Sequence, residues 1–240
     1  MTNENKVHSI QEFLYAEDRK RIVSTVIRMG EMAAEALENS VHALLNRDCV
    51  AAQKVILNDD FIDRLEETVD QECLGSIAMR SPEKSELCFV FGVLKIITDL
   101  ERIGDQAVAI AEKVLKMKTP SPFPKKECIL NMLAAVLAMF RLALEAFRTG
   151  DKEAASFLWK RDDEVDAIYA MCYDRFLEMA ITGARGNHEE VELGVLELWA
   201  ARHLERAGDH VINIGERVFY MMECKYFPSR EEREKSGKRK

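Results

Sequence analysis

Four pairs of acidic residues stand four positions apart in this sequence, a spacing that could bring ligands together for metal ions. Residues four apart on an α-helix lie on one face, so both carboxylates of a pair share a surface. Like charges at that spacing repel each other by roughly a few tenths of a kcal/mol, so helix propensity alone does not select them. The candidate metal ligands are therefore Asp59/Asp63, Glu101/Asp105, Asp162/Asp166 and Glu205/Asp209.

The ligand type limits which metals such sites would hold. Carboxylates suit hard cations such as magnesium, calcium, manganese and oxidised iron, and clustered carboxylates can bridge more than one ion. His203 and His210 flank the last pair and could add nitrogen ligands, which favour iron, zinc or nickel. A lone helical histidine is more often a surface residue, so the sequence leaves open whether these two, Glu112 or Glu216 are ligands. We expect metal ions as cofactors, in multinuclear clusters of iron, zinc, manganese or magnesium.

The carboxylate pairs recur because the chain contains a duplication. A shift of 104 positions lays residues Leu100–Met117 onto Leu204–Met221, and half of these positions are identical. A shift of 103 lays Asp59 onto Asp162, and the one-residue difference falls in a loop, where insertions are tolerated. A single pair would be typical of a solvated acidic face. Four pairs in duplicate positions, on consecutive helices that must be neighbours, favour two converging ligand clusters.

The elements that position these residues are predicted to be long helices. Glycine (11) and proline (5) are scarce, which favours uninterrupted helices over turn-rich β structure. Helix start and stop signals are Ser9 with Glu12, Asp48, Ser81 with Pro82, Gly150 with Asp151, and Asn187 with Glu190. They predict helices over about 10–47, 49–79, 82–118, 125–148, 152–182 and 188–224.

An apolar seam shows how these helices should pack. Steps of three and four residues separate the members of the seam in the third helix, as in a bundle core. Those members are Val93, Ile96, Leu100, Ile103, Ala107, Ile110, Val114 and Met117. We predict an all-α fold of two tandem three-helix bundles, covering residues 1–118 and 126–226. A linker (119–125) that contains three prolines separates them, and a basic tail (227–240) follows.

Composition excludes several other classes of protein. A net charge of −8 argues against nucleic-acid binding, which needs clustered Lys and Arg. The basic run Lys235–Lys240 is interpreted as a frayed tail. The sequence contains no nucleotide-binding loop, zinc-protease motif or nucleophile elbow, so we expect no enzyme activity. No window approaches the ~20 uncharged apolar residues of a membrane span, and no apolar signal region begins the chain.

The cysteine pattern is typical of a protein in a reducing compartment. None of the six is at the C-x-x-C spacing, and each falls within an apolar helical pattern. Such cysteines usually behave as small core hydrophobes in a reducing environment. We therefore expect a cytoplasmic protein with unpaired thiols.

Two strings connect the chain to a known family. LERIGDQAVAIAE (100–112) and LERAGDHVINIGE (204–216) resemble the signature of the PhoU family of phosphate-uptake regulators, and 59–63 and 162–166 resemble its companion motif. The resemblance covers nearly the whole chain. It implies two three-helix bundles whose surface metal clusters are held by paired E(D)-x-x-x-D motifs.

The resemblance also implies a function and partners. Such a regulator restrains the phosphate ABC transporter through its ATPase and keeps a sensor histidine kinase inactive when phosphate is plentiful. It would meet membrane complexes only peripherally. Long bundles with exposed faces commonly self-associate, so we expect a homo-oligomer such as a homodimer, although the sequence leaves the oligomeric state open. Gln106 stands where the family usually has histidine, which puts the first cluster in doubt.

Two alternatives remain open at this point. A metal-free helical adaptor would use the acidic pairs only as charges for partner binding. A ferritin-like di-iron carboxylate protein needs Glu-x-x-His motifs facing a bundle interior, and this sequence has none.

Overall fold

The computed structural model consists of six helices and contains no strand within the residues it describes, which are 3–78, 82–117, 127–183, 188–228 and 232. This confirms the all-α prediction. The helices are α1 (Asn3–Asn46), α2 (Cys49–Ala78), α3 (Lys84–Lys116), α4 (Glu127–Thr149), α5 (Lys152–Gly183) and α6 (His188–Glu223).

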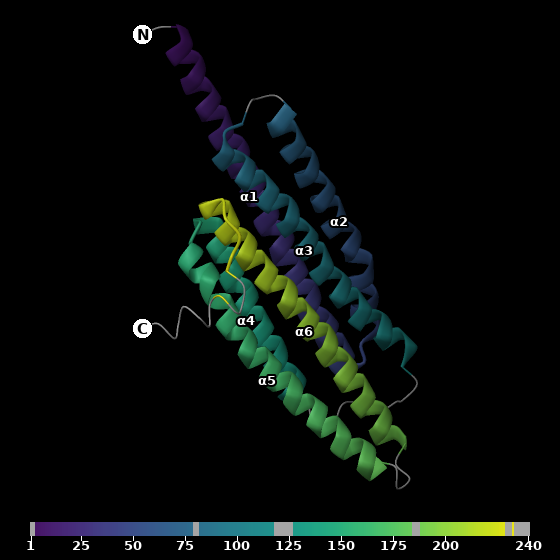
Figure 1. The fold of residues 1–240 in the computed structure, drawn as a ribbon. Helices are drawn as coiled ribbons and strands as arrows, with labels where there is room; N and C mark the ends of the chain where they lie inside the picture. Colours follow the sequence, from purple (N-terminus) through teal and green to yellow (C-terminus); the bar gives the residue numbers. More distant parts are fainter. Residues whose placement is uncertain (1–2, 79–81, 118–126, 184–187, 229–231, 233–240) are drawn as a thin grey trace.

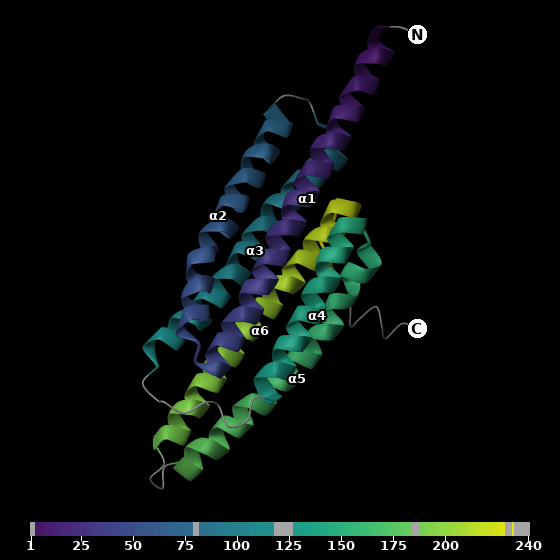
Figure 2. The same ribbon diagram turned by 180° about the vertical axis from the view of Figure 1, so that it is seen from behind.

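The helices form two elongated three-helix bundles that lie side by side (Figures 1 and 2). Helices α1, α2 and α3 pack on one another, and so do α4, α5 and α6. The bundles meet mainly where α3 packs along α6, with a smaller contact between α1 and α4. The outer sides of α2 and α5 face away from this contact, and they expose hydrophobic side chains such as Leu57 and Met171 among the charged ones.

The bundles are related by an approximate twofold axis through the α3–α6 contact. His203 Nδ1 lies 2.8 Å from Gln106 Oε1, and His210 Nδ1 lies 2.9 Å from Asp99 Oδ1. At the 104-residue offset, position 99 corresponds to 203 and position 106 to 210. In each contact, the residue at one of these two equivalent positions on one helix meets the residue at the other position on the other helix. Because the contact moves back along α3 as it moves forward along α6, the two helices are antiparallel.

The predicted seam of α3 is the core of the molecule. Seven of its eight members are buried, and Met117 packs partly buried against them. At Gly92 the Met221 side chain of α6 occupies the space that a Cβ would fill, and the backbone oxygen of Arg217 would lie 3.5 Å from that Cβ. The duplicated sequence therefore packs one copy of this helix on the other without intervening helices.

Several helix boundaries differ from the prediction. The Ser9/Glu12 capping box does not start a helix, because α1 begins at Asn3 and runs through both positions. Ser81-Pro82 does not start α3 either. Glu83 is its N-cap, and the backbone N–H of Glu83 donates to Glu86 Oε2 at 2.8 Å. The Asn187/Glu190 signal and the predicted linker lie outside the described side chains.

One helix corrects the expectation about membrane spans. α4 is apolar and long enough to cross a bilayer by length and composition, and half of its most apolar window is buried inside the molecule. It packs against α1, α5 and α6. Core helices of globular proteins share this composition, so α4 is interpreted as a core helix.

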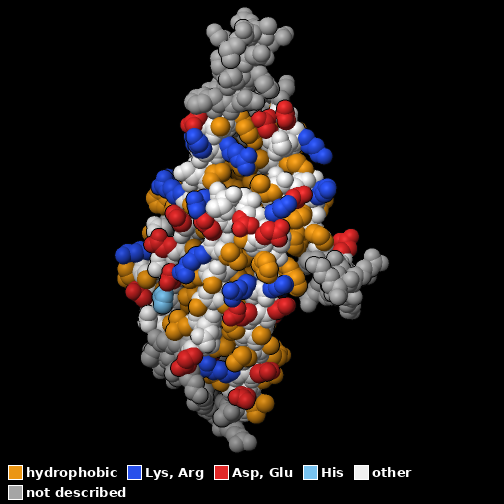
Figure 3. Space-filling model, turned by 90° about the vertical axis from the view of Figure 1, so that its left-hand side faces the viewer, with side chains coloured by type: hydrophobic (Ala, Val, Ile, Leu, Met, Phe, Trp, Pro, Cys, Tyr) orange, Lys and Arg blue, Asp and Glu red, His pale blue; other side chains and the backbone are white. Residues whose placement is uncertain are grey.

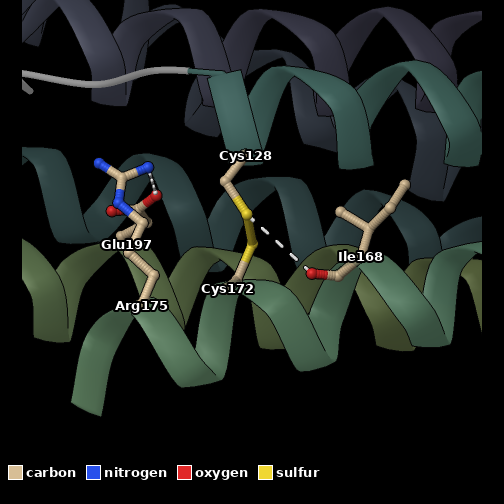
Figure 4. The surroundings of a disulfide bond; sticks show 5 residues. All are labelled: Cys128, Ile168, Cys172, Arg175 and Glu197. Atoms are coloured by element: carbon tan, nitrogen blue, oxygen red, sulfur yellow. Dashed lines mark hydrogen bonds and ion pairs between the residues drawn. A yellow bond between two sulfur atoms is a disulfide. The ribbon is translucent and has the colours of Figure 1, made fainter. Parts of the chain in front are cut away.

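The cysteine prediction was wrong for four of the six residues. Disulfides join Cys88 to Cys224 and Cys128 to Cys172. Figure 4 shows the second of these between α4 and α5. Only Cys49 and Cys73 have free thiols, and burial raises the pKa of the Cys73 thiol to about 12. The sequence did not reveal the pairs because residues 136 and 44 positions apart become neighbours only through helix packing.

The two aspartates predicted to cap helices do so, which allows a test. Asp48 Oδ1 accepts the N–H groups of Val50 and Ala51 at 2.9 Å, and Asp151 Oδ1 accepts those of Glu153 and Ala154 at 3.0 Å. Replacing a cap by alanine costs about 1 kcal/mol. We expect Asp48→Ala to lower the free energy of unfolding by about that amount in chemical denaturation, and Asp48→Asn, a good cap, to lower it by much less. Equal losses for the two variants would contradict the capping role.

Candidate functional site

The first carboxylate cluster lies between α2 and α3. Burial raises the pKa of Asp59 to about 6, and the charges of Asp63 and Asp105 add to this effect. Burial followed by the Asp105 charge raises the pKa of Glu101, and that of Asp63 is raised by burial and again by Asp105. The two predicted pairs are therefore close enough for the charge of one pair to raise pKa values in the other. We call these four residues the α2–α3 cluster.

The second cluster occupies the equivalent place between α5 and α6. Burial raises the pKa of Asp162 to about 6, with contributions from Asp166 and Asp209. The pKa of Glu205 is raised by burial and by Asp209, and that of Asp209 is raised by burial against the opposing charge of His210. These four carboxylates form the α5–α6 cluster. The structure thus brings together all eight predicted residues in two groups of four.

Both clusters place one aspartate deeper than its partner on the same helix. Asp59 and Asp162 are half-buried, whereas Asp63 and Asp166, one turn later, are exposed. Water is removed from the inner carboxylate while its neighbours remain negative, and both effects disfavour its charged form. The structure therefore keeps an unfavourable charge at the same place in both copies.

The two mid-helix glycines differ in how tightly they are packed. A Cβ at Gly104 would lie 2.9 Å from Asp59 Oδ1 and 3.2 Å from Ile62 Cδ1, so this glycine also makes room for the carboxylate. A Cβ at Gly208 would lie at an ordinary distance of 3.7 Å from Val165 Cγ1. Close packing therefore accounts for Gly104, which also contacts a cluster, whereas the surroundings of Gly208 have room for a Cβ and do not require glycine.

Arginine side chains already occupy part of each cluster. Arg102 Nη1 lies 3.2 Å from Asp105 Oδ2 and its Nε 3.4 Å from Glu101 Oε2. Arg202 Nη1 lies 2.8 Å from both carboxylate oxygens of Glu205. Within the described part of the chain, no three His, Cys, Asp or Glu side chains are grouped to hold a metal ion. The donor chemistry fits a hard cation, but an ion would have to draw these carboxylates away from the arginines.

The histidines contribute to the interface between the bundles. Nδ1 of each is used in the contact with α3 described above. Burial lowers the pKa of His203 to about 4, so it is neutral at pH 7. The sequence leaves open whether Glu112 is a ligand. It forms an ion pair with Lys116, whose Nζ lies 2.9 Å from Glu112 Oε2. The structure therefore gives no support to nitrogen ligation through Nδ1.

Comparison with known proteins decides the family. The PhoU domain matches this chain twice, at residues 26–114 and 129–218. The chain belongs to the PhoU family. The two matches coincide with the two halves of the duplication, and each includes one of the carboxylate clusters.

Related PhoU proteins span most of the chain. The phosphate-specific transport system accessory protein PhoU homolog of Rhizobium meliloti is 31% identical over 209 residues, which is 86% of either chain. The homolog of Pseudomonas aeruginosa is 29% identical over 92% of this chain and 90% of its own.

Solved PhoU structures share the fold. The crystal structure of PhoU from Pseudomonas aeruginosa has a TM-score of 0.79 at 28% identity, covering 88% of this chain and all of that one. The crystal structure of the phosphate transport system regulatory protein PhoU from Streptococcus pneumoniae also has a TM-score of 0.79, at 25% identity, covering 90% of this chain and all of the other.

Sequence reasoning missed the arginines. Arg202 has no counterpart in the first half, where Thr98 stands at the equivalent position and its hydroxyl donates to Glu66 Oε1 at 3.1 Å. The signal was available, because Arg202 and Glu205 are three apart and share a helix face. The two clusters of this PhoU-family chain therefore differ by a cation, whereas the sequence suggested that they differ by histidines.

The inner aspartates should make stability depend on pH. A carboxylate whose folded pKa is raised from 3.8 to about 6 binds more protons in the folded state between these values, so stability falls as pH rises through that window. We expect Asp59→Asn and Asp162→Asn each to raise the free energy of unfolding at pH 7 by on the order of 1 kcal/mol, after allowance for solvent screening.

Urea denaturation of metal-free protein at pH 4 to 7 would measure this dependence. Each variant should lose part of the dependence of the free energy of unfolding on pH. Asp174→Asn, at an exposed position whose charge acts on neither inner aspartate, should keep that dependence. A parent protein whose stability is flat over this range would contradict the assignment.

Proposed function

We propose that this chain is a non-enzymatic regulator of phosphate uptake that acts by binding partners. The observation that carries the proposal is the double PhoU-domain match, together with relatives named for the phosphate-specific transport system. The outward position of both carboxylate clusters adds support, because a partner could reach them there. Neither cluster contains a nucleophile placed beside a base, so binding is favoured over turnover.

The partners that we propose are the ATPase of a phosphate ABC transporter and a sensor histidine kinase. In this proposal the protein restrains the transporter and keeps the kinase inactive when phosphate is plentiful. It acts as a homodimer in the cytoplasm and meets the membrane complexes peripherally. These assignments rest on the family resemblance and on the names of the relatives.

We propose further that both clusters hold metal ions, which are iron, zinc, manganese or magnesium in multinuclear sites. Asp59, Asp63, Glu101 and Asp105 would hold one site, and Asp162, Asp166, Glu205 and Asp209 the other. A bound cation would offset the repulsion that raises the pKa of the inner aspartates. When bound, the metal would offer open coordination positions at the surface to an oxygen ligand of a partner or to phosphate.

A metal-free adaptor is the second candidate. It is favoured by the ion pairs of Arg102 and Arg202, which partly neutralise the clusters without any ion. In this alternative the carboxylates and arginines bind a partner directly.

Metal analysis separates the two candidates. We expect protein purified without chelator to contain metal, and Asp105→Asn to lose more of it than Asp209→Asn. The reason is that Arg202 lies closer to its carboxylate than Arg102 does, so the α5–α6 cluster should bind metal more weakly. Arg202→Ala should raise the metal content of that cluster. Elemental analysis by mass spectrometry gives the stoichiometry.

If the parent protein contains no metal even after dialysis against each candidate ion, the metal-site proposal is wrong and the metal-free adaptor is supported. Equal losses in Asp105→Asn and Asp209→Asn would remove the argument that Arg202 weakens the second cluster.

The regulatory proposal is tested by partner binding. We expect the double variant Glu205→Gln/Asp209→Asn to bind the transporter ATPase or the kinase at least about tenfold more weakly, because the binding surface loses two charges. Circular dichroism should show unchanged helicity, because neither residue belongs to the apolar seam. If the variant binds both partners as the parent does, the signalling surface lies elsewhere.

A further inference from the structure

We propose that Cys88 and Cys224 form a reversible redox-modification site that fastens the C-terminal end of α6 to α3. The modifying reagent is a low-molecular-weight disulfide of the glutathione class. This proposal goes beyond the regulatory function and does not depend on the carboxylate clusters or on metal.

The two cysteines lie where the ends of helices from different bundles meet. Cys88 is in the second turn of α3 and is 5% exposed, and Cys224 directly follows α6 and is half-buried. Their Cα atoms are 5.6 Å apart, within the usual range for a disulfide. The bond connects the two bundles across 136 residues of sequence.

The bond lies about one turn from the contact between Gly92 of α3 and the Met221 side chain of α6. Gly92 is one turn after Cys88, and Met221 is about one turn before Cys224. A Cβ at Gly92 would lie 2.1 Å from Met221 Cγ, so the helices have little space between them. A covalent bond one turn away therefore holds this contact in place.

Non-covalent contacts also hold the end of α6, where Met221 is buried against Gly92 of α3. Glu223 forms an ion pair with Lys152 of α5. The chain beyond Cys224 folds back, with the ring of Phe227 5.1 Å from that of Phe219 and the ring of Tyr226 5.4 Å from that of Tyr220. Tyr226 is nevertheless 74% exposed. Loss of the disulfide would remove the covalent link between this end and α3 and leave non-covalent contacts, such as the packing of Met221 on Gly92 and the ion pair of Glu223.

Cys224 is the accessible member of the pair. It lies beyond the last residue of α6, next to exposed residues, whereas Cys88 is buried. Partly exposed disulfides at such positions exchange more readily than buried ones. The Cys128–Cys172 disulfide differs because it joins α4 and α5, two neighbouring helices of one bundle, and Cys172 is 1% exposed. An ion pair between Arg175 and Glu197 lies beside it (Figure 4).

The exchange balances with a small disulfide as the oxidant. The Cys224 thiolate attacks one sulfur of the disulfide, forming a mixed disulfide and releasing one thiolate. The Cys88 thiolate then attacks the Cys224 sulfur, which forms the protein disulfide and releases the second thiolate. Two protein thiols are oxidised and one small disulfide is reduced to two thiols. Excess reduced thiol drives the reverse reaction.

Thiol labelling in glutathione buffers of graded redox ratio tests the proposal. After each incubation the protein is acid-quenched and denatured before labelling, so that labelling reports reduction and not exposure. Cys73, which is buried and free, then serves as the site labelled under all conditions, and Cys49, which is exposed and free, reports mixed-disulfide formation at an unpaired thiol. We expect Cys224 to change from protected to labelled at a less reducing ratio than Cys128 and Cys172. Over that step, hydrogen exchange of the backbone amides at 219–227 should become at least about tenfold faster.

Matched variants decide between a site-specific effect and general loosening. Cys224→Ser should show fast exchange at 219–227 under all conditions, and Cys128→Ser should keep the full redox response. Because Cys88 is buried and its replacement could unfold the protein, Cys224→Ser is the decisive variant. The proposal fails if Cys224→Ser still responds to the redox ratio. It also fails if both pairs are reduced at the same ratio, or if exchange at 219–227 is equal in the oxidised and reduced parent.

Discussion

The packing of α3 on α6 is the interaction on which the rest of the structure depends. The two helices carry the same duplicated sequence and pack antiparallel, so each apolar seam buries itself against its own bundle and against the other copy. The polar contacts between position 203 and position 106, and between position 210 and position 99, align the two helices. α2 lies along α3 and α5 lies along α6, away from this contact (Figure 1). The carboxylates therefore lie where α3 meets α2 and where α6 meets α5.

The two clusters show what the duplication has retained and what has diverged. Each copy keeps an inner aspartate that loses water and lies near other negative charges, which destabilises the folded protein above about pH 6. Groups with such perturbed pKa values concentrate at functional sites. The surroundings have diverged, since Arg202 has a threonine as its counterpart in the first half. On the face shown in Figure 3, basic and acidic side chains are interspersed with hydrophobic ones, so neither sign of charge dominates there.

The two disulfides add covalent links to helices that already pack through an apolar core. A three-helix bundle of this length buries enough apolar surface to fold without covalent links, and the seam of α3 is continuous from Val93 to Val114. Cys88, Cys128 and Cys224 lie near helix ends, whereas Cys172 is buried in the interior of α5. The disulfides therefore affect the relative position and fraying of helix ends more than the existence of the core.

The sequence by itself determined the class of fold, the duplication and the eight carboxylates, because these depend on periodicity and spacing within single helices. It also located the caps at Asp48 and Asp151, whose hydrogen bonds are local. Helix starts were less certain, since α1 continues through Ser9 and α3 begins after Pro82.

Only the tertiary structure decided which residues from distant parts of the chain meet. It paired four cysteines, directed His203 and His210 to α3, and placed the α3–α6 contact at the centre of the molecule. These outcomes depend on how whole helices pack, and the spacing of residues within one helix contains no information about the rotation or offset of its neighbour.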